Sequence, residues 1–331
     1  MQLSEAAAGT AAPRAMPSGP TIRRFALRYS LVIILALFLV TLAVSNRSFL
    51  TVSNMNVILI QVAANALLAT GATFVILTGG IDLSVGSVVG LSGVVAALFA
   101  QDDGPITCAE AVLLGVLAGA AIGAFNGALV ALAKVPPFVA TLGNMTVALG
   151  LAFVFSDGQP ISGLSDQFLR LSGTVGGFSI PVMVMIVVVA ISWIVLARTK
   201  FGMHVYAVGG NAHAARVAGV SLRGTRFAVY TIAGSLAGLA GVLLAARATA
   251  GIANTGTGYE LNAIAAAVIG GISLRGGRGS MVGTVFGFLI IGVLDNGLNI
   301  INVSPFYQLI VKGLIIIGAV FVDSLTHRTD D

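Results

Sequence analysis

Few residues of this chain could do chemistry, because most of the sequence is apolar. Polar or charged side chains fall within or at the ends of long apolar stretches at eight places: Asn65, Asn126, Asn144, Asn262, Asp295, Asn296, Asn299 and Lys312. A polar solute crossing apolar walls needs hydrogen bonds to replace those it made with water, and these side chains can supply them. They can equally hydrogen-bond one helix to another. Both interpretations stay open for each residue.

Two of these residues predict a more specific contact. Asp295 and Lys312 fall at comparable depth near the ends of consecutive apolar stretches. Opposite charges at that depth are costly unless they are paired. We therefore expect an ion pair between them.

A glycine-containing turn, Thr78 to Ser87, carries the sequence TGGIDLSVGS. Gly79 and Gly80 can adopt backbone angles that other residues cannot, and Asp82 with Ser84 could cap the following helix by accepting its free amide protons. Because ionisable groups at membrane depth are often functional, Asp82 also fits a gate or a substrate path. A related string at Ile269 to Gly283, IGGISLRGGRGSMVG, hints at an internal repeat.

A long basic loop, 199–226, holds the sequence NAHAARVAGVSLRGTR. The chain has no GxxxxGK[ST] loop, so it lacks the usual cradle for ATP phosphates. Energy for any transport must then come from a partner ATPase or from an ion gradient. A helical, Arg-rich loop is a suitable place for a partner ATPase to couple.

Other classes of protein are disfavoured by what the sequence lacks. Cys108 is the single cysteine, no two histidines stand at ligand spacing, and no nucleophile and base stand at working distance along the chain. We expect no metal, no bound cofactor and no enzymatic activity. The net charge of +5 follows from membrane topology and implies no nucleic-acid partner.

Composition indicates the elements that must position these residues. The chain is 57% hydrophobic and 9% charged, with a mean hydropathy of +1.02. Apolar runs of this length span a bilayer as helices. The sequence predicts an all-α polytopic membrane protein with about ten spans: 27–45, 55–77, 83–100, 108–133, 138–156, 181–198, 227–247, 259–274, 280–298 and 307–323.

The distribution of positive charge sets the orientation. Only Arg47, Arg170 and Arg247 fall in loops on one side, and nearly all other Lys and Arg residues fall on the opposite side. The positive-inside rule makes that side cytoplasmic, together with both termini. We expect a disordered cytoplasmic tail over 1–24, a membrane domain over 25–323 and a short cytoplasmic tail over 324–331.

Small residues at intervals of four mark the helix faces that pack closely. Gly115, Gly119, Gly123 and Gly127 share one face, and Gly234 and Gly238 repeat the pattern. Faces without side chains let helix backbones approach each other in lipid.

Several segments resemble one transporter family in the same order along the chain. They are GATFVILTGGIDLSVGS (Gly71 to Ser87), KVPPFVATLGNM (Lys134 to Met145), GGNAHAARVAGVS (Gly209 to Ser221), GYELNAIAAAVIGG (Gly258 to Gly271) and SPFYQLIVKG (Ser304 to Gly313). The chain is similar to the permease subunits of ribose-type ABC importers. The resemblance implies a homodimeric permease in the bacterial inner membrane, a cytoplasmic ATPase that binds ATP and magnesium, and a periplasmic sugar-binding protein.

The resemblance also implies a short coupling helix that docks into the ATPase. Here it would run from about Asn211 to Ala218 and end at Gly219 as a C-cap. The residues expected at this contact are Asn211, Ala212, Ala215, Arg216, Gly219 and Arg223. The imported solute would be a monosaccharide or a small polyol, with hexoses, pentoses and sugar alcohols all open. The alternative is a secondary, ion-coupled sugar transporter, which would need paired carboxylates deep in the membrane.

Overall fold

The computed structural model describes residues 30–46, 48–102 and 106–326. The expected tail over 1–24 and residues 327–331 of the expected C-terminal tail lie outside these ranges. One apolar helix lies at each of the ten predicted spans: α2 (Ser30–Ser45), α3 (Val52–Leu77), α4 (Val85–Phe99), α5 (Cys108–Ala131), α6 (Pro137–Ser156), α8 (Ile180–Arg198), α11 (Leu222–Ala248), α12 (Tyr259–Ile269), α13 (Met281–Ile300) and α14 (Pro305–Thr326). The all-α class is confirmed.

Six of these helices are long and apolar enough to cross a membrane: α3, α5, α6, α8, α11 and α13. The apolar helical segments within α2, α4, α12 and α14 are shorter. The number of crossings, ten, stays a prediction. The structure adds helices α7 (Asp166–Leu169), α9 (Lys200–Gly210) and α10 (Ala212–Val217), the 3-10 turn η1 (Arg170–Ser172) and strands β1 (Thr174–Val175) and β2 (Phe178–Ser179).

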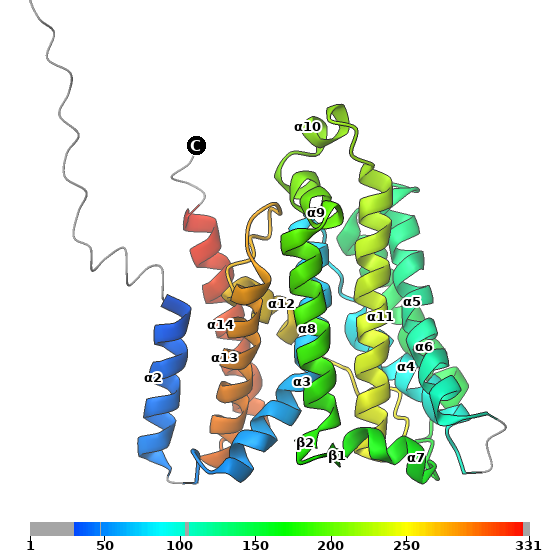
Figure 1. The fold of residues 1–331 in the computed structure, drawn as a ribbon, viewed down its shortest axis with the longest axis vertical. Helices are drawn as coiled ribbons and strands as arrows, with labels where there is room; N and C mark the ends of the chain where they lie inside the picture. The colour runs from blue at the N-terminus through cyan, green and yellow to red at the C-terminus, as the bar shows by residue number, and fades with distance from the viewer. Residues whose placement is uncertain (1–29, 47, 103–105, 327–331) are drawn as a thin grey trace, which may run out of the picture.

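The loops gather at two opposite ends of the bundle (Figure 1). Helix α10 lies at one end, which we call the α10 end. Strands β1 and β2 lie at the other, the hairpin end, where they pair antiparallel around Gly176 and Gly177, both with positive φ. Two successive residues of positive φ suit a two-residue hairpin turn. The separation agrees with the predicted alternation of loops across the membrane.

Burial divides the long helices into an inner and an outer group. Of the most apolar window of each helix, 72% is buried in α3 and 67% in α13, against 22% in α5 and α8. Helix α3 therefore lies in the centre, where Leu67, Phe74 and Tyr230 of α11 are among the largest fully buried side chains. Helices α5, α6 and α8 turn most of their apolar surface outward.

The glycine stripe predicted on α5 packs directly against that on α11. A Cβ added at Gly123 would stand 2.9 Å from the Cα of Gly234, and one added at Gly119 would stand 2.7 Å from the Cα of Gly238. Real Cβ atoms do not come this close. The two backbones therefore touch because neither helix carries a side chain at the crossing.

Irregular chain packs beside α4 and takes up the end of the span predicted for α12. The segment 249–258 returns along α4: Gly90 faces the carbonyl oxygen of Ala253, and Gly86 faces that of Gly256. Helix α12 then ends at Ile269, five residues before the predicted end, because Gly271 adopts a φ of 84°. Irregular backbone at membrane depth is tolerated here because it is packed inside the protein.

Candidate functional site

A polar cavity of about 510 Å³ lies toward the hairpin end, between α3, α11, α12, α13 and α14. We call it the polar cavity. Its lining residues are Gln61, Asn65, Leu244, Arg247, Ala248, Thr255, Tyr259, Asn262, Gly292, Asp295, Asn299, Gln308 and Lys312. Five of the eight polar residues considered for a path line this cavity: Asn65, Asn262, Asp295, Asn299 and Lys312.

The predicted ion pair forms in one wall of this cavity. Lys312 Nζ lies 3.0 Å from Asp295 Oδ1, and about a fifth of each side chain is exposed. The pair joins α13 to α14. A charged pair that is only partly desolvated keeps donors and acceptors for a solute.

Two amides of α3 offer unused hydrogen-bonding capacity in the opposite wall. Gln61 and Asn65 are four residues apart and so share one helix face. Gln61 Oε1 and Asn65 Oδ1 are buried and have no hydrogen-bond partner among the described residues. Buried acceptors left unpaired are costly, so hydroxyl groups of a solute or of water would stabilise them.

Further polar side chains in the cavity walls come from residues that the sequence analysis did not select. Gln308 Nε2 donates to Asn299 Oδ1 at 2.8 Å and to the carbonyl oxygen of Val303 at 2.9 Å, which fixes one wall. Thr255 adds a hydroxyl from the irregular segment, and Tyr259 adds one from the start of α12. The i, i+4 spacing of Gln61 and Asn65 within an apolar helix was a signal that could have identified Gln61.

The cavity has the size and the polar groups to hold a small polar solute. Its volume falls within the roughly 300–1,000 Å³ of typical small-molecule sites. Its walls supply amides, hydroxyls, one guanidinium and one ion pair. In the described part of the chain no group of three or more metal-ligating side chains gathers there or elsewhere.

Four residues predicted at the path or gate, Asp82, Ser84, Asn126 and Asn144, lie in a buried network between α5, α6 and the turn before α4. Asn126 Nδ2 donates to Ser84 Oγ at 2.7 Å, and Asn144 Nδ2 donates to Asn126 Oδ1 at 3.0 Å. Ser84 Oγ donates in turn to Asp82 Oδ1 at 2.7 Å. All four side chains are buried and none lines the polar cavity.

The expected capping of α4 by Asp82 and Ser84 is wrong in detail. Ser84 occupies the N-cap position but makes no side-chain cap hydrogen bond. Asp82 Oδ1 accepts the amide of Ser84 itself at 2.9 Å, one residue before the helix. The serine hydroxyl is taken by Asp82 and Asn126, so it is not available to the helix amides.

Asn296 is also separate from the polar cavity. Its amide exchanges two hydrogen bonds of 3.0 Å with that of Asn54, which joins α13 to the first turn of α3. Asn296 therefore hydrogen-bonds one helix to another, which was one of the two interpretations considered for it.

The two glycine turns meet at the α10 end, against the end of α9. The Gly277 amide donates to the Leu77 carbonyl oxygen at 2.9 Å. A Cβ added at Gly276 would stand 2.7 Å from the nitrogen of Gly79, and one added at Gly209 would stand 2.5 Å from the nitrogen of Gly277. We call this contact of three segments the glycine junction.

Tyr206 of α9 fastens the junction from the side. Its hydroxyl donates to the carbonyl oxygen of Gly279 at 3.0 Å. Partial burial raises the pKa of this hydroxyl above its usual range, so it stays protonated and can donate. Helix α9 is therefore tied to both glycine turns.

Helix α10 begins and ends close to where the sequence predicts. Asn211 Oδ1 accepts the Ala214 amide at 2.9 Å as N-cap. At the other end, Gly219 has a φ of 83°. The Gly219 amide donates to the Arg216 carbonyl oxygen, and the Val220 amide donates to the Ala215 carbonyl oxygen. This is a Schellman motif, and a left-handed residue is required at Gly219.

The residues expected at the ATPase contact do not all face outward. Asn211, Arg216, Gly219 and Arg223 are exposed, and Ala212 is half-buried. Ala215 is buried and packs in a small cluster with Val208 and Leu222. Its methyl group holds α10 on the neighbouring helices.

Sequence comparison places this arrangement in a family. The family model for the permease component of branched-chain amino acid transport systems matches residues 54–320. The chain belongs to this permease family. The match includes both the polar cavity and the glycine junction.

The permease is similar over most of its length to transport proteins of several bacteria. It is 45% identical over 295 residues to a ribose import permease protein of Bacillus subtilis, covering 87% of this chain and 91% of the relative. It is 42% identical to the ribose import permease protein of Escherichia coli K12, covering 89% and 92%. It is 40% identical to the D-allose transport system permease protein of the same strain, covering 91% of each chain. No solved structure matches the permease.

Proposed function

We propose that this permease forms the membrane path of an importer for ribose or a closely related monosaccharide. The polar cavity carries the proposal. A sugar has hydroxyl groups over its whole surface, and the cavity offers hydrogen-bonding side chains from helices on all its walls. Gln61 and Asn65 offer acceptors that are otherwise unpaired.

The cavity favours a sugar over a branched-chain amino acid, the solute in the family model's description. A branched aliphatic side chain would need an apolar wall, because its transfer from water is favourable only into apolar surroundings. Leu244, Ala248 and Gly292 are the only lining residues without a polar side chain. The names of the relatives, which include ribose, allose and L-arabinose systems, agree with this choice.

The energy source we propose is a separate ATPase subunit docked on α10. A permease of this family works with an ATPase and a substrate-binding protein. ATP and magnesium would bind to the ATPase, and this subunit would hold no cofactor. Movement of α10 would reach the glycine turns through α9, since Tyr206 and Gly209 contact the glycine junction.

The orientation predicted from the positive charges also places the partners of the permease. The α10 end and both termini would face the cytoplasm, and the hairpin end, 157–179, would receive the periplasmic binding protein. A second copy of the permease would complete a homodimer. The apolar outer faces of α5, α6 and α8 would contact lipid or this second copy.

The alternative, a secondary ion-coupled transporter, would need paired carboxylates deep in the membrane, and Asp82 and Asp295 do not form such a pair. Asp295 is paired with Lys312, and Asp82 is bonded by Ser84 and Asn126. Neither belongs to a pair of carboxylates. The relatives are named as permease components of import systems.

The test is uptake by cells that lack their own pentose and hexose importers and express the permease with its ATPase and binding protein. Labelled ribose, allose, galactose, arabinose and leucine would be compared. We expect uptake of at least one sugar and none of leucine. Leucine uptake without sugar uptake would overturn the proposal.

Variants of α3 provide the matched control within this assay. Asn65→Leu removes an amide from the polar cavity, and Asn56→Leu makes the same change at an exposed position on the same helix that lines no described cavity. We expect the first to lower sugar uptake at equal expression and the second to leave it unchanged.

A further inference from the structure

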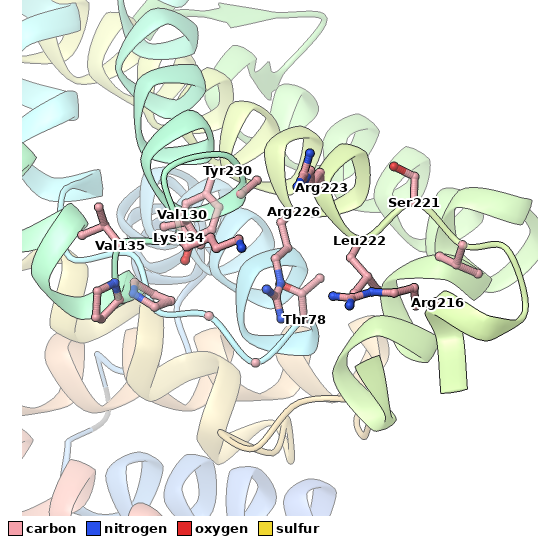
Figure 2. Close-up of a pocket in the computed structure, with 16 residues that line it drawn as sticks. Thr78, Val130, Lys134, Val135, Arg216, Ser221, Leu222, Arg223, Arg226 and Tyr230 are labelled. Carbon is pink, nitrogen blue, oxygen red and sulfur yellow. The ribbon is translucent and has the colours of Figure 1, made fainter. Parts of the chain in front are cut away.

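A second, larger cavity of about 810 Å³ opens at the α10 end, apart from the polar cavity. We call it the basic cavity (Figure 2). Its walls are the turn after α3, the turn between α5 and α6, and the chain from α10 into α11. The lining residues are Thr78, Gly79, Gly80, Val130, Ala131, Lys134, Val135, Pro136, Pro137, Arg216, Val220, Ser221, Leu222, Arg223, Arg226 and Tyr230.

Four cations share this cavity without a counter-charge. Lys134, Arg216, Arg223 and Arg226 line it, and no lining residue is acidic. Within the described ranges none of the four makes an ion pair. Like charges gathered in one recess repel each other, so an anion bound among them would be stabilised.

The backbone adds positive potential from two long helices. Helix α6 begins at Pro137 and α11 begins at Leu222, and both residues line the cavity. A helix N-terminus carries roughly half a positive charge. Two N-termini and four cationic side chains therefore converge on one space.

Two of the three hydroxyls that line the cavity already donate within the protein, and the third, Ser221 Oγ, accepts the Gly224 amide at 3.2 Å. Thr78 Oγ1 donates to the Val75 carbonyl oxygen at 2.8 Å, and Tyr230 Oη donates to that of Ile81 at 3.3 Å. The free side-chain donors are therefore the three guanidinium groups, the ammonium group and the Ser221 hydroxyl, so charged donors predominate. The site selects for negative charge rather than for hydroxyl groups.

The four cations line the mouth and the wall of the recess: Lys134, Arg216 and Arg223 are exposed, and Arg226 lies deeper. Arg226 is half-buried in the second turn of α11, and Arg216 extends toward it from α10 in Figure 2. Lys134 comes from the α5–α6 turn, where it holds a left-handed φ of 58°. An anion here would contact three separate segments at once.

The number and kind of donors favour a phosphoryl group. A guanidinium presents a planar fork that matches two phosphate oxygens, and a lysine adds a point charge. Three arginines and one lysine exceed what a single carboxylate can use. The volume accommodates a small ester as well as free phosphate.

We propose that the basic cavity binds a phosphoryl group, carried by a soluble phosphate ester or by the headgroup of an anionic lipid. The bound group links the α10–α11 chain to the α5–α6 turn, which carries Lys134, beside the turn that holds Gly79 and Gly80. An occupied cavity would therefore fix the coupling segment to the α5–α6 turn. The site is independent of the identity of the imported sugar.

The test uses the full-length permease in nanodiscs of phosphatidylcholine. Inorganic phosphate, ribose 5-phosphate and ribose would be titrated by calorimetry. In a parallel arm, permease extracted from cells would be examined by native mass spectrometry for retained phosphatidylglycerol. Variants are Arg226→Gln, Lys134→Gln and the charge-preserving Lys134→Arg, with Lys200→Gln as an exposed control outside the cavity at the same end.

We expect one phosphoryl-bearing ligand to bind and ribose not to bind here. Each Gln variant should weaken that binding about tenfold or more, since each removes a charge-assisted hydrogen bond. Lys134→Arg and Lys200→Gln should retain it, and melting temperatures would confirm that all variants fold. Binding in the first arm identifies a soluble ester, and loss of phosphatidylglycerol from the Gln variants identifies a headgroup.

Two outcomes would overturn the proposal. One is the absence of any phosphoryl ligand in both arms, or equal binding by wild type and the Gln variants. The other is displacement of the phosphoryl ligand when the ATPase is added without nucleotide, because carboxylates of that subunit would then be the natural occupants.

Discussion

At the scale of single residues, the polar side chains of the membrane domain do three different jobs. Asn65 and Lys312 line the polar cavity, Asp82 and Asn126 hold helices together in a buried network, and Asn296 pairs with Asn54. The distinction is physical. Groups whose hydrogen bonds are used within the protein stabilise it, and groups with unpaired atoms beside a cavity are free to bind a solute.

The ion pair of the polar cavity gives the first prediction. Asp295→Ala leaves Lys312 with no described carboxylate partner at membrane depth, so it should lower stability and uptake. The loss of stability should fall below the roughly 3–5 kcal/mol of a fully buried pair, because a fifth of each side chain is exposed. Thermal unfolding in detergent and labelled sugar uptake would measure both effects.

The double variant Asp295→Ala with Lys312→Met is the control for this pair. It removes both charges and should recover much of the stability lost in the single variant. A single variant as stable and active as wild type would show that the pair is unimportant.

The buried network gives the second prediction. Asn126→Leu takes a donor from Ser84 and an acceptor from Asn144, at a cost of about 1–3 kcal/mol for polar groups left unpaired. Its melting temperature should fall clearly below that of Asn56→Leu, which alters an exposed amide. Equal melting temperatures for the two variants would contradict the network's structural role.

At the scale of elements, the connection from α10 to the turn that holds Gly79 and Gly80 depends on glycine. Gly219 ends α10 with a positive φ, and Gly209 lets α9 touch both glycine turns. A side chain at either position must distort a turn or separate two backbones. We expect both positions to affect coupling more than membrane insertion.

Gly219→Val tests the coupling helix. A β-branched residue in the left-handed region costs about 1–2 kcal/mol and disfavours the Schellman turn. The variant should insert normally but lose ATPase binding or sugar-stimulated ATP hydrolysis in the reconstituted complex. Gly219→Asn, which tolerates this conformation, should retain most of both activities; full activity of the Val variant would refute the role of the turn.

Gly234→Val tests the crossing of α5 and α11. The added atoms would collide with the backbone of Gly119 and Gly123, and overpacking typically costs about 1–3 kcal/mol. Gly143→Val on α6 is the control, since a Cβ there meets nothing within 4 Å. The melting temperature of the first variant should fall and that of the second should not, and a reversed order would disprove close packing at this crossing.

Much of this architecture could be predicted from the sequence. Length and hydropathy located all ten apolar helices, and spacing by four identified the glycine faces of α5 and α11. The early end of α12 could not be predicted, because hydropathy does not distinguish buried irregular chain from helix. The segment 249–258 was expected between two spans, but its packing along α4 could not be foreseen. In the polar cavity, Asn65, Asn262, Asp295, Asn299 and Lys312 were selected from the sequence, whereas Gln61 and Gln308 are recognised only once five helices meet.

At the scale of the whole molecule, two cavities lie toward opposite ends of one bundle. The polar cavity, with its unpaired amide oxygens, lies toward the hairpin end, and the basic cavity lies at the α10 end beside the turn that holds Gly79 and Gly80. No residue lines both cavities. We expect a solute to cross the packed protein between them only after a rearrangement that an outside energy source drives.

We propose that a separate ATPase drives a monosaccharide through this permease. This is tested by uptake of labelled ribose into proteoliposomes that contain the permease and its ATPase, with and without the binding protein and ATP on the cytoplasmic face. We expect uptake only when the binding protein and ATP are both present, and no change in uptake when proton and sodium gradients are collapsed. Uptake that needs neither and follows an imposed ion gradient would contradict it.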